Sequence, residues 1–298
     1  MKLERLYPAV ITTLWGGKKL FSYGKESKEE NISETWELSF YKEHPCILDN
    51  GIPLMDVVSK DDLGSNVSKF NIFPVLVKFI DADKDLSVQV HPDDEFALKV
   101  EHELGKTEMW HILEAEEDAG IYLGFKRDTT PEEVRSKVED GSILELLNFI
   151  PVHKGESYFI PAGTVHAIGK GVTLIEIQQN SNITYRLYDY KRVDKNGNYR
   201  ELHLDKALKV LNYKKYQPVT FKKPILGECR YFRTSLYPIA NQDIVADSSS
   251  FKSIHIISGN GRIGGYEYKK GDSFFLPANQ RCHIEGNGKM VVVEVPSK

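Results

Sequence analysis

Apolar and polar residues alternate in short runs along most of the chain, and glycine, proline, asparagine and aspartate separate the runs. Clear examples, rich in β-branched and aromatic side chains, lie at 73–80, 120–125, 157–160 and 290–295. Runs of this length and composition between turn residues are typical of strands in an antiparallel sandwich or barrel. The pattern therefore predicts an all-β fold class with a few helices.

Helical patterns are fewer than strand patterns. The clearest begins at Thr130, a favourable N-cap residue, because Pro131 occupies the first helical position and two glutamates follow in the first turn. Further helices are expected over 93–103, 142–148 and 205–211.

One segment of the chain is repeated. The sequence KGESYFIPA at 154–162 is echoed by KGDSFFLPA at 270–278. Two copies of one β unit predict two related β domains in tandem. The lysine-rich stretch 214–224 contains two prolines and is the expected seam. We therefore expect a first domain over 1–215 and a second over 216–298.

Composition argues against a nucleic-acid-binding, membrane or secreted protein. The 298 residues include 39 Lys+Arg and 43 Asp+Glu, for a net charge of −4, so the basic excess that favours nucleic-acid binding is missing. No apolar run approaches the ~20 residues of a membrane span, and the first residues lack the apolar segment of a secretory signal. Three well-separated cysteines indicate reduced thiols. We expect a cytoplasmic protein that binds neither nucleic acid nor membrane.

Polar and apolar side chains alternate strictly over 86–91. On a strand, Ser87, Gln89 and His91 share one face, and leucine and valines share the other. Such a polar face is costly to bury because each group needs a partner. It therefore faces water or lines a functional cavity, and the residues alone leave a solvated histidine and a metal site equally open.

A turn rich in small residues precedes a second histidine. Residues 155–166 read G-x5-P-x-G-x2-H, which is similar to the second motif of the cupin superfamily, whose histidine binds a metal inside a β-barrel. Lys170 stands where the general motif has asparagine. The other cupin motif is present in altered form as Gln89-Val90-His91, and its glutamate is deferred to Glu108 after a helix-like segment.

Several separated motifs together resemble those of type I mannose-6-phosphate isomerases in their short bacterial form. These motifs lie at 15–17, 33–39, 86–94, 105–110, 161–167 and 180–190. Motifs that agree in order are far more specific than any one of them. The resemblance implies two tandem cupin-type (jelly-roll) β-barrels with a helical insertion in the first. It also implies interconversion of mannose 6-phosphate and fructose 6-phosphate through a cis-enediol.

The same resemblance places the family's zinc ligands on Gln89, His91, Glu108 and His166. It places the family's catalytic arginine on Arg186. We expect one zinc ion per chain, because the second copy of the repeat has Cys282 where the first has His166. The residue types suit this assignment, because zinc accepts imidazole nitrogen and carboxylate oxygen and a catalytic site keeps one position open. One carboxylate among neutral donors leaves about one positive charge on the site, which favours an oxyanion.

Two charged residues are candidates for catalysis. Arg186 stays protonated, so it can stabilise an enediolate or bind a phosphate, or it can be a surface arginine paired with Asp189. Glu176 alternates with two isoleucines on the strand expected over 172–177, so it faces the cavity if the isoleucines face the core. It lies ten residues before Arg186, at a spacing that resembles the family's acidic position. It is the leading candidate for proton transfer, while metal-held water, Ser87 and Lys106 stay open as helpers.

The phosphate anchor is not determined by the sequence. The basic candidates are Arg186, Lys106, Lys126, Arg127, Lys191 and Arg192. In the second copy of the repeat, Cys282 aligns with His166, and His283 is one position off and points to the opposite face. The second domain is therefore expected to be metal-free.

Two other functions compete with the isomerase. One is an iron-dependent cupin oxygenase, whose usual ligands are several histidines and one carboxylate. The other is a non-catalytic, sugar-sensing cupin. The oligomeric state is open between a monomer and a weak dimer.

Overall fold

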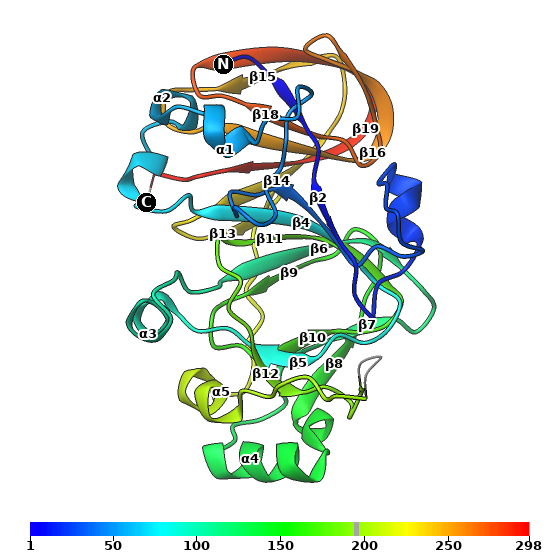
Figure 1. The fold of residues 1–298 in the computed structure, drawn as a ribbon, viewed down its shortest axis with the longest axis vertical. Helices are drawn as coiled ribbons and strands as arrows, with labels where there is room; N and C mark the ends of the chain where they lie inside the picture. The colour runs from blue at the N-terminus through cyan, green and yellow to red at the C-terminus, as the bar shows by residue number, and fades with distance from the viewer. Residues whose placement is uncertain (194–196, 298) are drawn as a thin grey trace.

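The computed structural model describes residues 1–193 and 197–297. Most of its regular structure is strand, arranged in three sheets whose named strands all pair antiparallel (Figure 1). The prediction of a mostly β fold with a few helices is confirmed. None of the helices in the described ranges is long and apolar enough to cross a membrane.

A six-stranded sheet lies in the middle of the molecule (Figure 1). Its strands, in spatial order, are β2 (Ala9–Ile11), β3 (Glu34–Leu38), β4 (Val75–Ala82), β11 (Val172–Gln179), β6 (Glu108–Ala115) and β9 (Ser157–Ile160). On β11 the side chains alternate as expected, because Ile175 and Ile177 pack in the core on one face while Glu176 points to the other. The sheet therefore has one apolar face and one face that carries polar groups.

A five-stranded sheet lies below it in Figure 1. Its strands, in spatial order, are β12 (Tyr185–Tyr188), β5 (Val88–Val90), β10 (His166–Ile168), β7 (Gly120–Phe125) and β8 (Leu147–Pro151). Apolar side chains from both sheets, including Ile80, Ile112 and Leu123, pack together between them. The two sheets thus enclose an interior, and polar side chains at one end of it form the candidate site.

An eight-stranded sheet forms the upper part of the molecule (Figure 1). Its members are β1 (Glu4–Leu6), β18 (Ser273–Leu276), β16 (Lys252–Ile263), β19 (Gln280–Glu294), β14 (Arg233–Pro238) and β13 (Ile225–Glu228), with β15 (Gln242–Ala246) on β19 and β17 (Tyr266–Lys269) on β16. Strand β1 comes from the beginning of the chain and pairs with β18. The division at 215/216 and the tandem arrangement stay predictions, and β1 is a segment that crosses that division.

The eight-stranded sheet packs against two apolar cores. One lies between it and the six-stranded sheet and includes Phe79, Phe232 and Val293. The other fills its own interior with side chains such as Ile254 and Phe274.

The helices lie outside the sheets. They are α1 (Leu54–Val57), α2 (Lys60–Leu63), α3 (Asp94–Val100), α4 (Pro131–Asp140) and α5 (Leu204–Val210). Helix α4 begins as predicted, since the Thr130 side chain accepts a hydrogen bond from the Glu133 amide. Helices α3 and α5 lie within the segments 93–103 and 205–211, apart from Leu204 at the start of α5.

The helix expected over 142–148 is wrong beyond its first turn. A short 3-10 helix covers Ile143–Leu146, and strand β8 begins at Leu147. The Asn148 side chain donates hydrogen bonds to three carbonyl groups of β7, Leu123 to Phe125. Pairing with a distant strand therefore overrides the local helical preference of this segment.

Candidate metal centre and active-site pocket

Strand pairing in the five-stranded sheet brings three predicted site residues into one row. Gln89 on β5 lies opposite His166 on β10 and, on its other side, opposite Arg186 on β12. His91 follows the end of β5, two residues after Gln89, so it returns to the same face. One face of this sheet therefore presents an amide, two imidazoles and a guanidinium.

The six-stranded sheet supplies the carboxylates from across the interior. Glu108 is the first residue of β6 and pairs with Gln178 of β11, while Trp110 pairs with Glu176. Glu108 and Glu176 are both buried. Because these positions alternate with apolar residues that face the opposite core, both carboxylates point toward the histidines.

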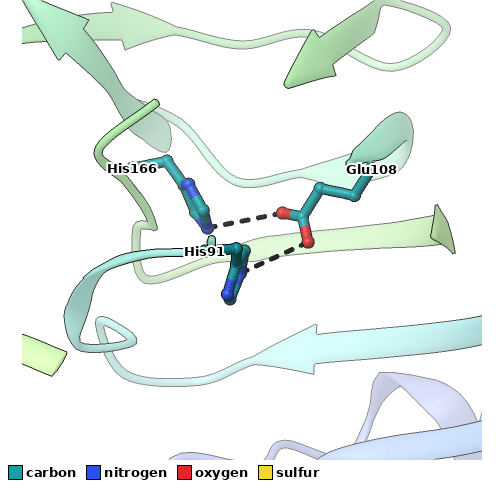
Figure 2. Close-up of side chains that lie close together, drawn as sticks. All are labelled: His91, Glu108 and His166. Carbon is teal, nitrogen blue, oxygen red and sulfur yellow. Dashed lines mark ion pairs between the residues drawn. The ribbon is translucent and has the colours of Figure 1, made fainter. Parts of the chain in front are cut away.

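Three of the predicted ligands form one buried cluster (Figure 2). The Nε2 atoms of His91 and His166 lie 3.4 Å from the two carboxylate oxygens of Glu108, one on each. The possible ligand atoms of the three residues all lie within 4.8 Å of one another. Two nitrogens and a carboxylate that converge in this way form a donor set that zinc accepts.

Hydrogen bonds orient both imidazoles for metal binding. The His91 Nδ1 lies 2.7 Å from the Ile183 carbonyl oxygen, and the His166 Nδ1 lies 2.8 Å from that of Thr164. A carbonyl only accepts, so each Nδ1 carries the proton and each Nε2 turns its lone pair toward Glu108. Burial lowers the pKa of His91 well below its usual value and that of His166 to about 4. The Lys106 ammonium acts in the same direction, so both rings are neutral, as metal ligands must be.

Two further observations fit a bound cation. The Glu108 Oε1 atom is buried and has no hydrogen-bond partner, which is costly unless another group binds it. The Gln89 side-chain amide lies 3.3 Å from the His166 Nε2 and 3.5 Å from the His91 Nε2. A half-turn of that amide brings its oxygen toward the same point. The four residues therefore fit a zinc ion.

Lys106 lies at the edge of this cluster, where the sequence had suggested only a helper. Its Nζ lies 3.0 Å from the His91 Nε2 and donates to the Glu108 carboxylate. Burial opposes its charge, but Glu108 and Glu176 outweigh that effect and raise the pKa of Lys106. The signal in the sequence was the Lys-x-Glu spacing, since residues two apart on an extended chain share a face.

A pocket of about 200 Å³ lies next to the cluster, because Gln89 and Lys106 line it and both contact the cluster residues. Its wall includes Gln89, Lys106, Glu176, Arg186 and other residues from both sheets and from the segment before β3. The Arg186 Nε donates to the Ser87 hydroxyl over 3.2 Å, and its Nη1 donates to the Glu201 carbonyl oxygen over 2.8 Å. Arg186 is thus fixed at the pocket wall.

Asp189 does not pair with Arg186, contrary to one of the alternatives. Its carboxylate instead accepts hydrogen bonds from Arg192 and Arg200. Arg200 lines the same pocket as Arg186, although no sequence motif singles it out. A spacing of 14 residues along the chain carries no signal of this proximity.

Glu176 is a buried carboxylate that lines the pocket. Its Oε2 accepts a hydrogen bond from the Trp110 indole over 2.8 Å, and its Oε1 lies 3.8 Å from the Lys78 Nζ. Burial, together with the nearby Glu108 charge, raises the pKa of Glu176. Such a carboxylate is a stronger base than one in water.

Glu34 and Lys78 were not among the predicted residues, yet both line the pocket. The Lys78 Nζ lies 3.2 Å from the Glu34 carboxylate. Burial opposes ionisation of Glu34, but the Lys78 ammonium outweighs it and lowers the pKa of Glu34. Two carboxylates around one lysine are therefore shifted in opposite directions.

Most of the expected phosphate-binding residues lie elsewhere. Lys126 and Arg127 are exposed and bind the Glu145 carbonyl and the Glu133 carboxylate. Lys191 is also exposed. Lys106 and Arg186 are the candidates from that set among the residues that line the pocket.

The second copy of the repeat differs in the way the sequence indicated. Cys282 packs among apolar side chains in the interior of the eight-stranded sheet. His283 is exposed on the other face, and its Nδ1 lies 2.7 Å from the Asp243 carboxylate. The described residues of this sheet contribute nothing to the His91, Glu108 and His166 cluster.

Comparison with known proteins identifies relatives over the whole chain. The family model "Phosphomannose isomerase type I, catalytic domain" matches residues 3–113, and "Mannose-6-phosphate isomerase, cupin domain" matches 223–295. The curated mannose-6-phosphate isomerase ManA of Bacillus subtilis is 37% identical, over 98% of this chain and 99% of its own. The mannose-6-phosphate isomerase of Streptococcus mutans is 34% identical, over 89% of each chain.

A solved structure agrees with these sequence matches. The crystal structure of the mannose 6-phosphate isomerase from Bacillus subtilis superposes with a TM-score of 0.88 at 31% identity, covering 98% of this chain and 99% of that one. The overall cupin-type fold is therefore shared. At this identity over nearly the full length of both chains, the protein belongs to the type I mannose-6-phosphate isomerases, a family of aldose–ketose isomerases.

Proposed function

We propose that this chain interconverts mannose 6-phosphate and fructose 6-phosphate and uses one zinc ion held by Gln89, His91, Glu108 and His166. The observation that carries the proposal is the buried His91, Glu108 and His166 cluster beside a pocket lined by Glu176 and other charged groups. The relatives reported above are isomerases, which favours this function over the oxygenase and the sugar sensor.

In the proposed reaction, the zinc ion and the surrounding side chains have different roles. A bound zinc ion supplies Lewis-acid stabilisation of negative charge on the sugar oxygens. Glu176 accepts the C2 proton of open-chain mannose 6-phosphate, and the C–H electron pair forms the C1=C2 bond while the π pair of the C1=O bond moves to O1. O1 takes a proton from water to give the cis-enediol. Protonated Glu176 then returns its proton to C1 as the O2–H proton passes to water and the C2=O2 bond forms, which gives fructose 6-phosphate. The raised pKa of Glu176 suits both the acceptance and the return of that proton.

Arg186 is placed to act on negative charge in the pocket. Its Nε and one terminal nitrogen are engaged by Ser87 and Glu201, so the guanidinium is held before substrate arrives. A fixed cation costs little reorganisation when charge develops on the enediolate. Arg186 therefore stabilises that intermediate in the proposed mechanism.

Metal removal tests the proposed function directly. We expect the purified chain to convert mannose 6-phosphate in a coupled assay and to hold about one zinc ion per chain. Chelation should abolish turnover, and added zinc should restore it, because the Lewis acid alone contributes several kcal/mol to the barrier reduction. Metal analysis with two tightly held ions per chain would contradict the assignment of the second domain as metal-free.

Arg186→Ala should keep the zinc and lower kcat by about 10²–10³-fold, the usual loss for a donor that stabilises a transition-state charge. KM should change little, because the contact is made to charge that develops during the reaction. Steady-state kinetics on zinc-loaded protein measures both constants.

Arg186→Lys is the matched variant for this test. It should recover only part of the loss, since an ammonium cannot reproduce the planar guanidinium. A raised KM with near-normal kcat in Arg186→Ala would instead assign this residue to phosphate binding.

A further inference from the structure

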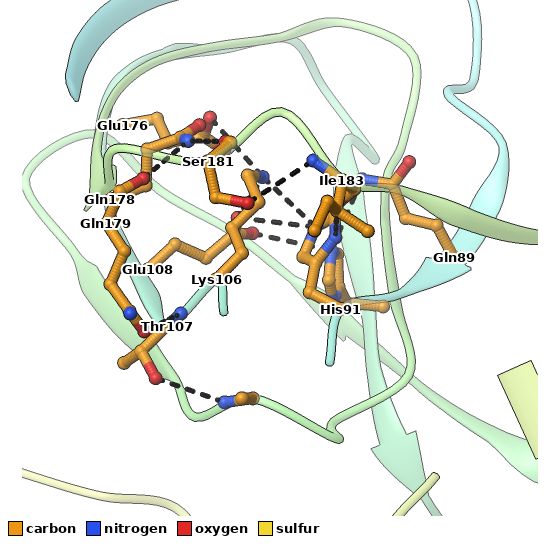
Figure 3. A network of polar contacts seen from close by, with 12 residues as sticks. Gln89, His91, Lys106, Thr107, Glu108, Glu176, Gln178, Gln179, Ser181 and Ile183 are labelled. Carbon is orange, nitrogen blue, oxygen red and sulfur yellow. Dashed lines mark hydrogen bonds and ion pairs between the residues drawn. The ribbon is translucent and has the colours of Figure 1, made fainter. Parts of the chain in front are cut away.

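The three residues before Glu108 are held in place by their backbone amides. The Gly105 amide donates to the Asp94 Oδ1 over 2.9 Å, and the Lys106 amide donates to the Pro92 carbonyl over 3.0 Å. The Thr107 amide donates to the Gln179 side-chain oxygen over 2.8 Å. We call residues 105–108 the ligand arm, because this segment carries Lys106 and Glu108 into the metal cluster (Figure 3).

Asp94 organises two of these three contacts. Its Oδ1 accepts both the Gly105 amide and the Gln179 Nε2, the latter over 2.9 Å. A carboxylate only accepts hydrogen bonds, so it fixes the direction of the Gln179 amide and leaves the amide oxygen free for Thr107. Gln179 is 2% exposed, and its backbone amide donates to the Thr107 carbonyl as well. Asp94 therefore secures the ligand arm directly and through Gln179.

The second carboxylate oxygen of Asp94 accepts a hydrogen bond from a residue 137 positions later in the chain. The Tyr231 hydroxyl donates to the Asp94 Oδ2. Tyr231 lies in the turn between β13 and β14, is 5% exposed, and is followed by the fully buried Phe232. A hydrogen bond from the Cys229 amide to the Phe232 carbonyl closes that turn. The turn between β13 and β14 is thus well packed, and it holds the Tyr231 hydroxyl beside Asp94.

The geometry points to a positioning role for Tyr231 and Asp94. We propose that their hydrogen bond fixes the ligand arm, so that the turn between β13 and β14 affects the zinc affinity and turnover of a site to which it contributes no ligand. This inference rests on the proposed zinc-dependent function. It also gives the C-terminal part of the chain a role at the proposed metal site.

The expected loss of zinc affinity and activity in variants of Tyr231 and Asp94 follows from the role of these residues in orienting the metal ligands. Groups that orient metal ligands typically change metal affinity or activity by about 10–100-fold when they are removed. Tyr231→Phe removes one hydroxyl and keeps the ring, so its effect belongs at the lower end of that range. Asp94→Asn disturbs the Gly105 and Gln179 contacts too, so its effect should be larger.

The test compares zinc affinity and kinetics in full-length variants. Tyr231→Phe should lower zinc affinity about tenfold in competition with a colorimetric chelator. It should lower kcat while leaving KM within about twofold.

Tyr268→Phe is the matched control. Tyr268 is similarly buried in the eight-stranded sheet, and its hydroxyl donates to the Asn287 carbonyl over 3.2 Å, away from the ligand arm. Its zinc affinity and kinetics should equal those of the wild type.

A double-mutant cycle separates this coupling from general destabilisation. In the Asp94→Asn background, Tyr231→Phe should lower zinc affinity by much less than it does alone, because its partner has already changed. Equal zinc affinity and kcat in Tyr231→Phe and Tyr268→Phe would overturn the inference while leaving the proposed function intact. A wild-type chain that binds no zinc would instead contradict the proposed function itself.

Discussion

His166→Ala is expected to remove both the metal and the isomerase activity. The His166 Nε2 is a potential ligand atom of the buried His91, Glu108 and His166 cluster, and alanine offers no replacement atom. Loss of a Lewis acid that contributes several kcal/mol corresponds to a fall in kcat of about 10³-fold or more. Metal analysis and a coupled assay on the same preparation measure the two losses together. His91→Ala should behave in the same way, because it removes the other imidazole of the cluster.

The control for this prediction is His283→Ala. This histidine is exposed, pairs with Asp243, and lies beside the position that aligns with His166 in the repeat. We expect it to keep its zinc and its turnover. Full activity in His166→Ala would mean that the metal site, or its role in the reaction, is assigned to the wrong residues.

Glu176→Gln should keep zinc but lower kcat by about 10²-fold or more, because the side chain keeps its size and loses only its ability to accept a proton. The amide oxygen can still accept the hydrogen bond from Trp110, so the pocket should hold its shape. Kinetics on zinc-loaded protein tests the change. Unchanged turnover would transfer the base role to another group.

The pH profile gives a second measurement for Glu176. Its pKa is raised, and a base acts only when it is ionised, so activity should fall as the pH drops through a value above the usual carboxyl range. Glu34→Gln is a matched carboxylate variant in the same pocket. Because Lys78 lowers the pKa of Glu34, that residue is a weak base, and its replacement should leave the acidic limb of the profile in place.

Local sequence patterns were sufficient for the fold class and for helix α4. The cap at Thr130 and the alternation on β11 depend only on neighbouring residues, and both are found in the structure. The helix expected over 142–148 was wrong because β8 forms through hydrogen bonds to β7, some 20 residues earlier. Such pairing energy is not contained in the propensity of the segment itself.

Local sequence patterns were also insufficient to predict how the candidate site is assembled. Alternation along each strand places Gln89 beside His91 and Glu108 beside Lys106, but it cannot say that the two strands face one another. The inference that both strands contribute to one metal site came from the family resemblance. Arg200 was missed because nothing local distinguishes it, and Lys126 was a candidate on charge alone, although it lies outside the pocket.

The pairing of β1 with β18 also has a consequence for the order of folding. Leu6 pairs with Ser273, so the eight-stranded sheet cannot gain this edge strand until both have left the ribosome. At ordinary rates of synthesis the first strand waits on the order of 10–50 seconds. The last strand of the two sheets around the His91, Glu108 and His166 cluster ends at Tyr188, so these sheets can form during that interval. The strands around the candidate site can therefore pair first, and the pairing of β1 with β18 is a late, long-range step.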